Sequence, residues 1–289
     1  MNTKILFVLA TAMVVPFNVL AKDTHPGDHV AVSDEVIAHQ RANLEKNTVG
    51  KGFGPQAPRD IDSVAGSNTV SFSPAPAHTE MNLCNIHFHK NAEHKGGEFT
   101  KYSGNGDGQG YNSGFKYSGA LSREEMVHLD HEVCPSEHGG LQSGDTIEVH
   151  YVHSTAQVKP GPTLGACLND AIMNPQLRVE TQVYVLVNDS GALDFKKLTV
   201  HGKRNGFQQA LGIPNNTGKP VQYSGSTTGP SYNEQGSPFQ VTWSVRPNVA
   251  KVNIASVGEW CKGNVFNEVH GHGVRNLVKN PKLISEIDQ

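Results

Sequence analysis

The residues best suited to chemistry in this 289-residue chain lie in segment 85–94, which reads NIHFHKNAEH. If this segment is a β-strand, the side chains of His87 and His89 point to the same face, because successive side chains of a strand alternate between faces. Two imidazoles on one face can bind one metal ion at about 2.0 to 2.1 Å, while Phe88 points to the other face. The spacing therefore predicts two of the ligands of a metal site.

A second segment, 147–153 with the sequence IEVHYVH, offers a third ligand. On a strand, Glu148 and His150 share one face and His153 lies on the other. Three histidines with one open tetrahedral position are typical of catalytic zinc, which lowers the pKa of bound water to ~7. The same donor set also accommodates cobalt, cadmium or iron. The predicted Zn2+ ligands are His87, His89 and His150.

Two polar residues are placed to support these ligands. Asn85 and Glu148 each stand two residues before a ligand histidine and therefore share its face. Ligand imidazoles usually donate their second N–H to such a group, which fixes the tautomer. A carboxylate in an apolar strand is costly unless it is paired, so Glu148 favours a built site.

The elements that must position these residues are predicted to be mainly strands. Four segments alternate and are rich in Val, Ile, Thr and aromatic residues: 82–89, 146–153, 179–187 and 239–245. The 30 glycines and 16 prolines favour many short strands joined by loops over a helical bundle. We therefore expect a single mainly β (α+β) domain with small helices around it.

Two helices are expected outside the sheet. One runs from Asp34 to about residue 46, is capped by Ser33, and packs through Val36, Ile37 and Leu44. The other begins after residue 122 in the long irregular stretch 95–144. On this helix, His128 and His131 would lie on one solvated face.

The first 21 residues are predicted to be a secretory signal peptide. Lys4 precedes an apolar run over residues 5–15, and small residues stand three and one before Lys22. The run is shorter than the ~20 residues that a membrane span needs, and no later segment is apolar enough. We expect an exported protein, periplasmic or secreted, with an N-terminal extension over 22–49 and the main domain over 50–289.

In an exported chain, the four cysteines are expected to form two disulfides. Three pairings are possible for Cys84, Cys134, Cys167 and Cys261.

The charge argues against one class of partner: 24 Lys and Arg against 27 Asp and Glu give a net charge of −3, so no nucleic-acid partner is expected. The sequence leaves the oligomeric state open.

Taken together, these segments resemble a known family. The segments that resemble carbonic anhydrases of the α class are 87–94 (HFHKNAEH), 148–153 (EVHYVH), 56–61 (QAPRDI) and 223–230 (YSGSTTGP) followed by 241–243 (VTW). Segments 52–60 (GFGPQAPRD) and 272–275 (HGVR), with the compact His-Phe-His-x3-Glu-His spacing, are closer still to the δ class. The resemblance implies a central twisted, mostly antiparallel sheet, like that of the α class, with zinc at the base of a cleft.

The resemblance implies a zinc hydro-lyase that interconverts CO2 and bicarbonate by attack of zinc-bound hydroxide. Thr227 would take the hydrogen bond of that hydroxide and pass its own proton to Glu93, with Thr228 lining the pocket. Because the loop is one residue shorter than in the α class, Thr228 or Ser226 are alternative gate positions. The implied buried network around the ligands consists of His94, Glu148 and Tyr223.

The remaining assignments concern the substrate wall and proton release. Val152 shares the face of the third ligand, and Val183 and Val185 share a face of the next strand, so these three are candidates for an apolar CO2 wall. A histidine with a pKa near 6.5 suits proton release, and His78 is a candidate for this role. His270 and His272 are interpreted as residues of a polar strand or loop.

Two other interpretations fit part of the pattern. The His-x-His-x3-Glu spacing of segment 87–93 matches a cupin oxidoreductase or isomerase, in which Glu93 would be a fourth ligand to iron or manganese. That reading leaves the Thr-Thr loop without a role. The other alternative is a non-catalytic exported zinc-binding protein that retains the fold.

Overall fold

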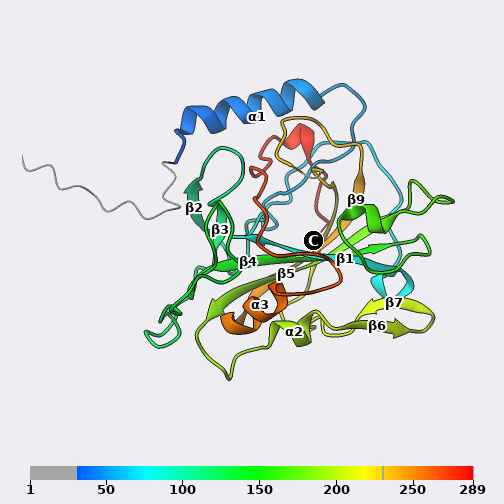
Figure 1. The fold of residues 1–289 in the computed structure, drawn as a ribbon. Helices are drawn as coiled ribbons and strands as arrows, with labels where there is room; N and C mark the ends of the chain where they lie inside the picture. Colours follow the sequence, from blue (N-terminus) through cyan, green and yellow to red (C-terminus); the bar gives the residue numbers. More distant parts are fainter. Residues whose placement is uncertain (1–30, 230, 289) are drawn as a thin grey trace, which may run out of the picture.

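A five-stranded sheet with the order β1-β4-β5-β9-β8 forms the centre of the molecule (Figure 1). The computed structural model describes residues 31–229 and 231–288. The strands are β1 (Asn82–Lys90), β4 (Thr146–Ser154), β5 (Leu177–Val187), β8 (Val221–Ser226) and β9 (Gln240–Asn253). Three neighbouring pairs are antiparallel and the β5–β9 pair is parallel, so the sheet is mixed. The predicted mainly β fold and its four predicted strands are confirmed.

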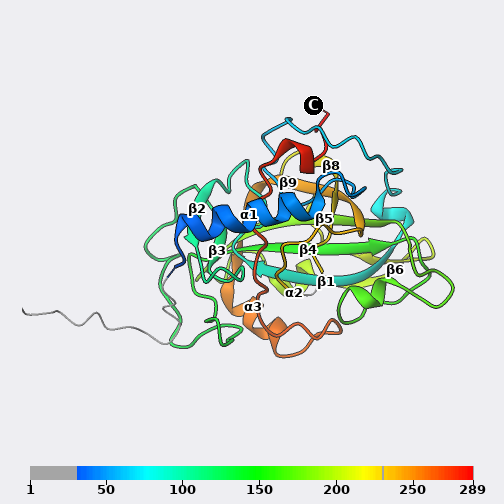
Figure 2. The same ribbon diagram turned by 90° about the horizontal axis from the view of Figure 1, so that it is seen from above.

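The other elements are short and lie around this sheet. Two hairpins pair β2 (Lys101–Asn105) with β3 (Ser113–Lys116) and β6 (His201–Arg204) with β7 (Phe207–Ala210). The helices are α1 (Asp34–Thr48), α2 (Phe195–Leu198) and α3 (Ile254–Cys261), with 3-10 turns η1 (His78–Glu80), η2 (Leu164–Cys167) and η3 (Pro281–Leu283). Helix α1 lies on one side of the sheet and α2 and α3 lie on the other (Figures 1 and 2).

The register of β1 and β4 brings the chemical residues together. His87 pairs with His150, and His89 pairs with Glu148. Directly paired residues of an antiparallel sheet present their side chains on the same face, so all four point to one side. We call this side the pocket face and the opposite side the far face.

Each face of the sheet carries its own core. On the far face, Phe88, Val149 and Tyr151 pack with residues of α2 and α3, including Phe195 and Trp260. On the pocket face, a second cluster surrounds the polar centre and contains Val152, Val179, Val183, Val241 and Trp243. The alternation of side chains along the same strands therefore separates the two environments.

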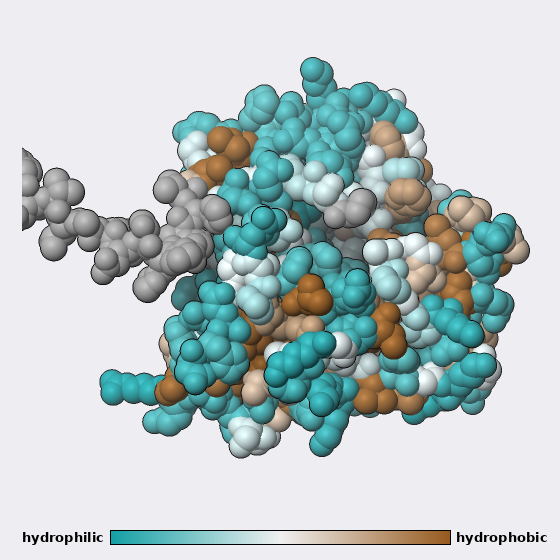
Figure 3. Space-filling model, in the orientation of Figure 1, coloured by the Kyte–Doolittle hydropathy of each residue, from teal (hydrophilic) through white to brown (hydrophobic). Residues whose placement is uncertain are grey.

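Helix α1 covers the pocket side with a narrower stripe than expected. Ile37 and Leu44 are buried, and Leu44 packs on the C-terminal residues Val278 and Leu283. Val36 is 40% exposed, so its predicted packing role is wrong. One residue along a helix turns the side chain by about 100°, which carries Val36 off the stripe that the C-terminal segment covers. The region around α1 in Figure 3 is mainly hydrophilic, with small separate hydrophobic patches.

Two disulfides select one of the three possible pairings. Cys84 in β1 is bonded to Cys167 in η2 on the pocket side. Cys134 is bonded to Cys261 at the end of α3. The second bond holds the irregular stretch between β3 and β4 against the far-face core, because both cysteines belong to that cluster.

The helix predicted after residue 122 is wrong: the described chain makes a turn there. The carbonyl of Glu125 accepts a hydrogen bond from the backbone N–H of Asn188, and the carbonyl of Val127 accepts one from its side chain. These carbonyls are therefore taken by the loop after β5 instead of by a helical partner. His128 and His131 are exposed, as expected for surface residues.

No helix within residues 31–229 and 231–288 has the length and apolar character needed to cross a membrane. The predicted signal peptide, residues 1–21, lies outside the described residues.

Candidate metal centre

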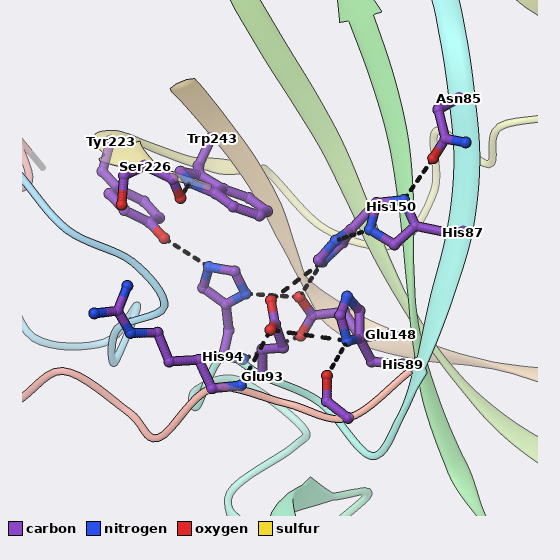
Figure 4. A network of polar contacts seen from close by, with 12 residues as sticks. Asn85, His87, His89, Glu93, His94, Glu148, His150, Tyr223, Ser226 and Trp243 are labelled. Atoms are coloured by element: carbon purple, nitrogen blue, oxygen red, sulfur yellow. Dashed lines mark hydrogen bonds and ion pairs between the residues drawn. The ribbon is translucent and has the colours of Figure 1, made fainter. Parts of the chain in front are cut away.

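Three histidines from two neighbouring strands converge on the pocket face (Figure 4). One nitrogen from each of His87, His89 and His150 lies within 4.8 Å of the others. His89 and His150 are buried and His87 is half-buried. The cluster is compact because the two strands place His87 directly opposite His150. A group of this kind can bind a metal ion.

The outer nitrogen of each imidazole has a hydrogen-bond partner. Nδ1 of His87 lies 2.6 Å from Oδ1 of Asn85, and Nε2 of His150 lies 2.6 Å from Oε1 of Glu148. Nδ1 of His89 lies 2.7 Å from the carbonyl oxygen of Gly273. Carbonyl and carboxylate oxygens accept, so each of these nitrogens carries the hydrogen. Sequence reasoning named Asn85 and Glu148 but missed Gly273, whose contribution is a backbone carbonyl.

These partners leave a lone pair on the inner nitrogen of each ring. Nε2 of His87 and Nδ1 of His150 face each other at 3.1 Å. With their other nitrogens protonated, neither atom has a hydrogen to donate, so the contact needs a cation or a proton between them. The donor set therefore fits a metal ion bound by Nε2 of His87, Nε2 of His89 and Nδ1 of His150.

The surroundings favour the neutral imidazoles that metal binding requires. Burial lowers the pKa of His89 to about 4. Burial and then the neighbouring His150 place the pKa of His87 well below its usual value, and burial lowers that of His150. The rings therefore remain unprotonated in neutral solution.

A buried chain of hydrogen bonds extends from the third histidine. Oε1 of Glu148 also lies 2.7 Å from Nδ1 of His94, whose Nε2 lies 2.6 Å from the hydroxyl of Tyr223. Burial raises the pKa of Glu148, but the electrostatic interaction and the hydrogen bonds with His94 and His150 outweigh it and hold this pKa well below its usual range. Glu148 thus stays a carboxylate and accepts from both imidazoles.

Glu93 lies beside this series of hydrogen bonds. Its Oε1 accepts a hydrogen bond from the backbone N–H of Arg275 at 3.4 Å and is 3.8 Å from Nδ1 of His89. Its Oε2 is 3.9 Å from Nε2 of His150. Burial raises the pKa of this carboxyl. Both contacts are to the outer nitrogens of the rings.

A cavity of about 70 Å3 opens next to the three inner nitrogens. Its volume suits a small molecule, since one water occupies about 30 Å3 of liquid. The lining residues that are not histidines are Ala57, Pro58, Glu93, Val152, Leu164, Val179, Ser226, Thr227, Thr228, Gly229 and Trp243. Thr227 and Thr228 therefore reach the cavity, and the backbone N–H of Thr227 donates to the carbonyl of Phe239. Among the described residues, no hydrogen bond joins Thr227 to Glu93.

The apolar candidates divide between the cavity wall and the core. Val152 lines the cavity, whereas Val183 and Val185 are buried elsewhere on the same face. Leu164 and Val179, which line it instead, were missed. Val179 pairs with Val152 across β4 and β5, and this register was the signal that could have found it. Leu164 is brought over the sheet by the disulfide in η2 and carries no such local signal.

The structure does not bring His78 to the cavity. Nδ1 of His78 lies 3.5 Å from Oε1 of Glu180, which pairs with Tyr151 and therefore lies on the far face. Another histidine lies close to this group of three: the ring centroid of His272 is 5.6 Å from that of His87. A hydrogen bond to Glu268 outweighs burial and raises the pKa of His272. This position was not singled out as part of the site.

Comparison with known proteins identifies the family. Residues 78–256 match the model of the family described as delta carbonic anhydrase. The match covers more than half of the chain, so the chain belongs to the delta carbonic anhydrase family. Enzymes of this class catalyse the reversible hydration of CO2 to bicarbonate, and the CO2 hydration predicted for this chain is confirmed at the level of the family.

Solved structures give a more distant likeness. An α-carbonic anhydrase from Thermovibrio ammonificans, in complex with sulfanilamide, is 16% identical over 78% of this chain and 84% of its own, with a TM-score of 0.28. An α-carbonic anhydrase from Photobacterium profundum is 16% identical over 79% and 88%, with a TM-score of 0.28. A halotolerant carbonic anhydrase from Dunaliella salina is 14% identical over 89% and 97%, with a TM-score of 0.32. No curated protein sequence matches the chain.

The family also decides against the cupin interpretation. That interpretation requires Glu93 as a metal ligand, and among the described residues Glu93 does not join the group formed by His87, His89 and His150. Its carboxylate faces the outer nitrogens of two of these rings.

Proposed function

We propose that this protein is an exported zinc carbonic anhydrase whose metal ligands are His87, His89 and His150. The observation that carries the proposal is the pair of facing lone pairs, 3.1 Å apart, on His87 and His150. Two unprotonated nitrogens that face each other and cannot donate are the arrangement that a bound cation resolves. The donor set of three neutral imidazoles suits zinc.

The protein residues have separate tasks in this proposal. Zinc bound at the three histidines would supply a Lewis acid that makes hydroxide available at neutral pH. Asn85, Glu148 and the carbonyl of Gly273 hold the imidazoles in the required tautomer. His94 and Tyr223 keep Glu148 in place from behind. Such outer partners typically change metal affinity 10–100-fold.

The apolar side of the cavity would receive CO2. Val152, Leu164 and Val179 form this wall, beside the indole of Trp243. An apolar wall excludes water from the substrate position and strengthens the electrostatic interactions there. Val183 packs in the same cluster as Val152 and Val179, so its proposed role moves from the wall to the support behind it.

The gate assignment is the most specific part of the proposal. Thr227 would orient the attacking oxygen through its hydroxyl and donate to Glu93, and Thr228 would line the opposite side. Both threonines border the cavity that also exposes Glu93. Of the two alternatives, Ser226 is the weaker one, because its hydroxyl is directed at Oε1 of Gln56 at 3.4 Å.

Substitution Thr227→Ala tests the gate. We expect the variant to retain its zinc and to hydrate CO2 about a hundredfold more slowly, the size typical of losing one orienting hydrogen-bond group. Stopped-flow rates and metal content are measured on the same sample. Unchanged hydration in Thr227→Ala together with a loss in Thr228→Ala would move the gate to Thr228.

Export rests on a separate set of observations. The sequence of residues 1–21 predicts a signal peptide, and all four cysteines are paired in disulfides, which persist in oxidising compartments. N-terminal sequencing of the protein made in a secreting host tests this part. A mature chain that begins at Lys22 is expected, and an uncleaved Met1 in the purified protein would contradict it.

A further inference from the structure

A second cavity lies beneath α1, away from the metal centre. We call it the α1 cleft; its volume is about 700 Å3, within the range of small-molecule sites. Its lining combines residues of α1, of the hairpin β2–β3, of the segments on either side of β1 and of the C-terminal stretch 277–284. None of these residues lines the cavity at the three histidines. Nothing in the carbonic anhydrase reaction uses this cleft.

Three cations from three separate elements face the α1 cleft. Arg41 comes from α1, Lys95 follows β1, and Lys279 lies in the C-terminal segment before η3. They are near enough to act on one another: burial and then the charges of Arg41 and Lys95 lower the pKa of Lys279. Like charges are gathered here although the whole chain carries a net charge of −3.

The two acids of the cleft already have partners. Oδ2 of Asp60 pairs with Nζ of Lys95. Oδ1 of Asp34 accepts a hydrogen bond from Nδ2 of Asn105 at 2.8 Å, at the N-terminal end of α1. Within the described part of the chain, the ammonium of Lys279 makes no ion pair or hydrogen bond. Asn105 is neutral and leaves the charge of Asp34 in place, so three cations against two acids give the lining a net charge of +1.

The remainder of the lining is largely apolar. Ile37, Leu277 and Ile284 are each at most 5% exposed, and Phe115 is 7% exposed. Nε of Arg41 donates to the carbonyl of Leu277 at 3.3 Å, which fixes the guanidinium beside this apolar floor. A cavity that combines an apolar floor with a few convergent charged groups suits a ligand with the same two parts.

From this arrangement we propose that the α1 cleft binds a small organic carboxylate. The carboxylate contacts Lys279 and the guanidinium of Arg41, and the apolar body lies against Ile37 and Leu277. Charge-assisted hydrogen bonds to a carboxylate supply the specificity, and burial of the apolar body supplies the remaining affinity. The site takes an anion without any contribution from the metal centre.

Calorimetric titration of benzoate into the zinc-loaded mature protein tests this assignment. We expect Lys279→Gln and Arg41→Gln each to weaken binding about tenfold, because each removes one charge-assisted contact worth about that factor. Lys282→Gln is the matched control, since Lys282 is exposed in η3 and does not line the cleft. Equal benzoate binding by the wild type and Lys279→Gln would overturn the proposal.

Two further measurements distinguish binding in the α1 cleft from binding at other anion sites. Carboxylates also bind catalytic metals, and His150→Ala removes a proposed zinc ligand. We expect this variant to retain benzoate binding. Loss of benzoate binding in His150→Ala would assign the anion to the metal centre and overturn the proposal. Inorganic phosphate and benzylamine are titrated as probes that lack the apolar body or the negative charge. Binding of either one as tightly as benzoate would contradict the carboxylate class.

Discussion

The two faces of the central sheet are built from the same strands, yet they are held together differently. On the far face, Phe88, Val149 and Tyr151 are fully buried in a contiguous apolar cluster. On the pocket face, the neighbouring residues His87 and His150 are each held by a directional hydrogen bond, to Asn85 and to Glu148. Adjacent residues of one strand therefore serve stability on one side and chemistry on the other.

The difference teaches where substitutions should act. Removing volume from an apolar core costs free energy of unfolding, because the surroundings relax only partly around the cavity. Removing one member of a polar network around metal ligands acts mainly on metal affinity, because the lost contact orients a ligand. The alternation of a strand makes these two effects separable at neighbouring positions.

The largest expected change in stability follows from Phe88→Ala. Phe88 stands between two proposed ligands in the sequence but packs against Phe195 and Trp260 on the far face. We expect the free energy of unfolding to fall by about 3–5 kcal/mol, the usual cost of a buried Phe→Ala change, with zinc content unchanged. Urea unfolding and metal analysis measure both quantities, and Tyr102→Ala at an exposed position is the control. A folded variant that loses its zinc would break the separation of the faces.

Glu148→Gln is the corresponding change on the pocket face. Glutamine keeps the shape and an acceptor oxygen but removes the charge that two imidazoles share. We expect zinc affinity to fall 10–100-fold, which is about 1.4–2.7 kcal/mol, and the metal-free protein to lose much less stability than Phe88→Ala. Competition with a chelator gives the zinc affinity. Wild-type affinity in Glu148→Gln would show that the charge does not support the ligand.

The smallest effect concerns His153, a buried histidine of the far face. Burial lowers the pKa of His153 to about 3, and Nδ1 of this ring donates to the carbonyl of Tyr151. Because the unfolded chain has a pKa near 6.5 at this residue, it binds more protons than the folded chain between about pH 6.5 and pH 3. Stability from this group is therefore complete above pH 6.5 and is lost as the pH falls, by about 1.4 kcal/mol at pH 5.5.

The control for this pH effect is His153→Gln, which has no titrating group at this position. Unfolding free energies at pH 8 and pH 5.5 should differ by about 1.4 kcal/mol less in the variant than in the wild type. His78, Glu180 and Arg178 face the same ring and remain unchanged in both proteins. An equal loss in both proteins would mean that His153 does not titrate as a buried group.

The parts that could be predicted from the sequence are those that a strand dictates locally. The period of two predicted the strands, and it placed Asn85 and Glu148 on the faces of their histidines, where the structure has them. No residue in the sequence indicated the partner of His89, because that partner is a backbone carbonyl 184 residues away, at Gly273. Any residue type could supply that carbonyl, so no side chain announces it.

Other features depended on long-range packing in the same way. The disulfide pairing required the positions of four segments at once, and the helix predicted after residue 122 lost its carbonyls to Asn188 in a distant loop. The wall of the cavity uses Val179 and Leu164 in place of Val183 and Val185: Val179 pairs with Val152 across the sheet, and Leu164 comes from the separate 3-10 turn η2. The domain limits at residues 21/22 and 49/50 stay predictions.

The most direct test of the account is stopped-flow CO2 hydration by the mature chain, residues 22–289, with metal content determined on the same sample. We predict about one zinc ion per chain and fast hydration, both lost in His150→Ala and both retained in His128→Ala, which changes an exposed histidine. Retention of zinc and activity in His150→Ala would contradict the ligand assignment. Zinc without hydration activity in the wild type would contradict the enzyme and favour the non-catalytic zinc-binding alternative.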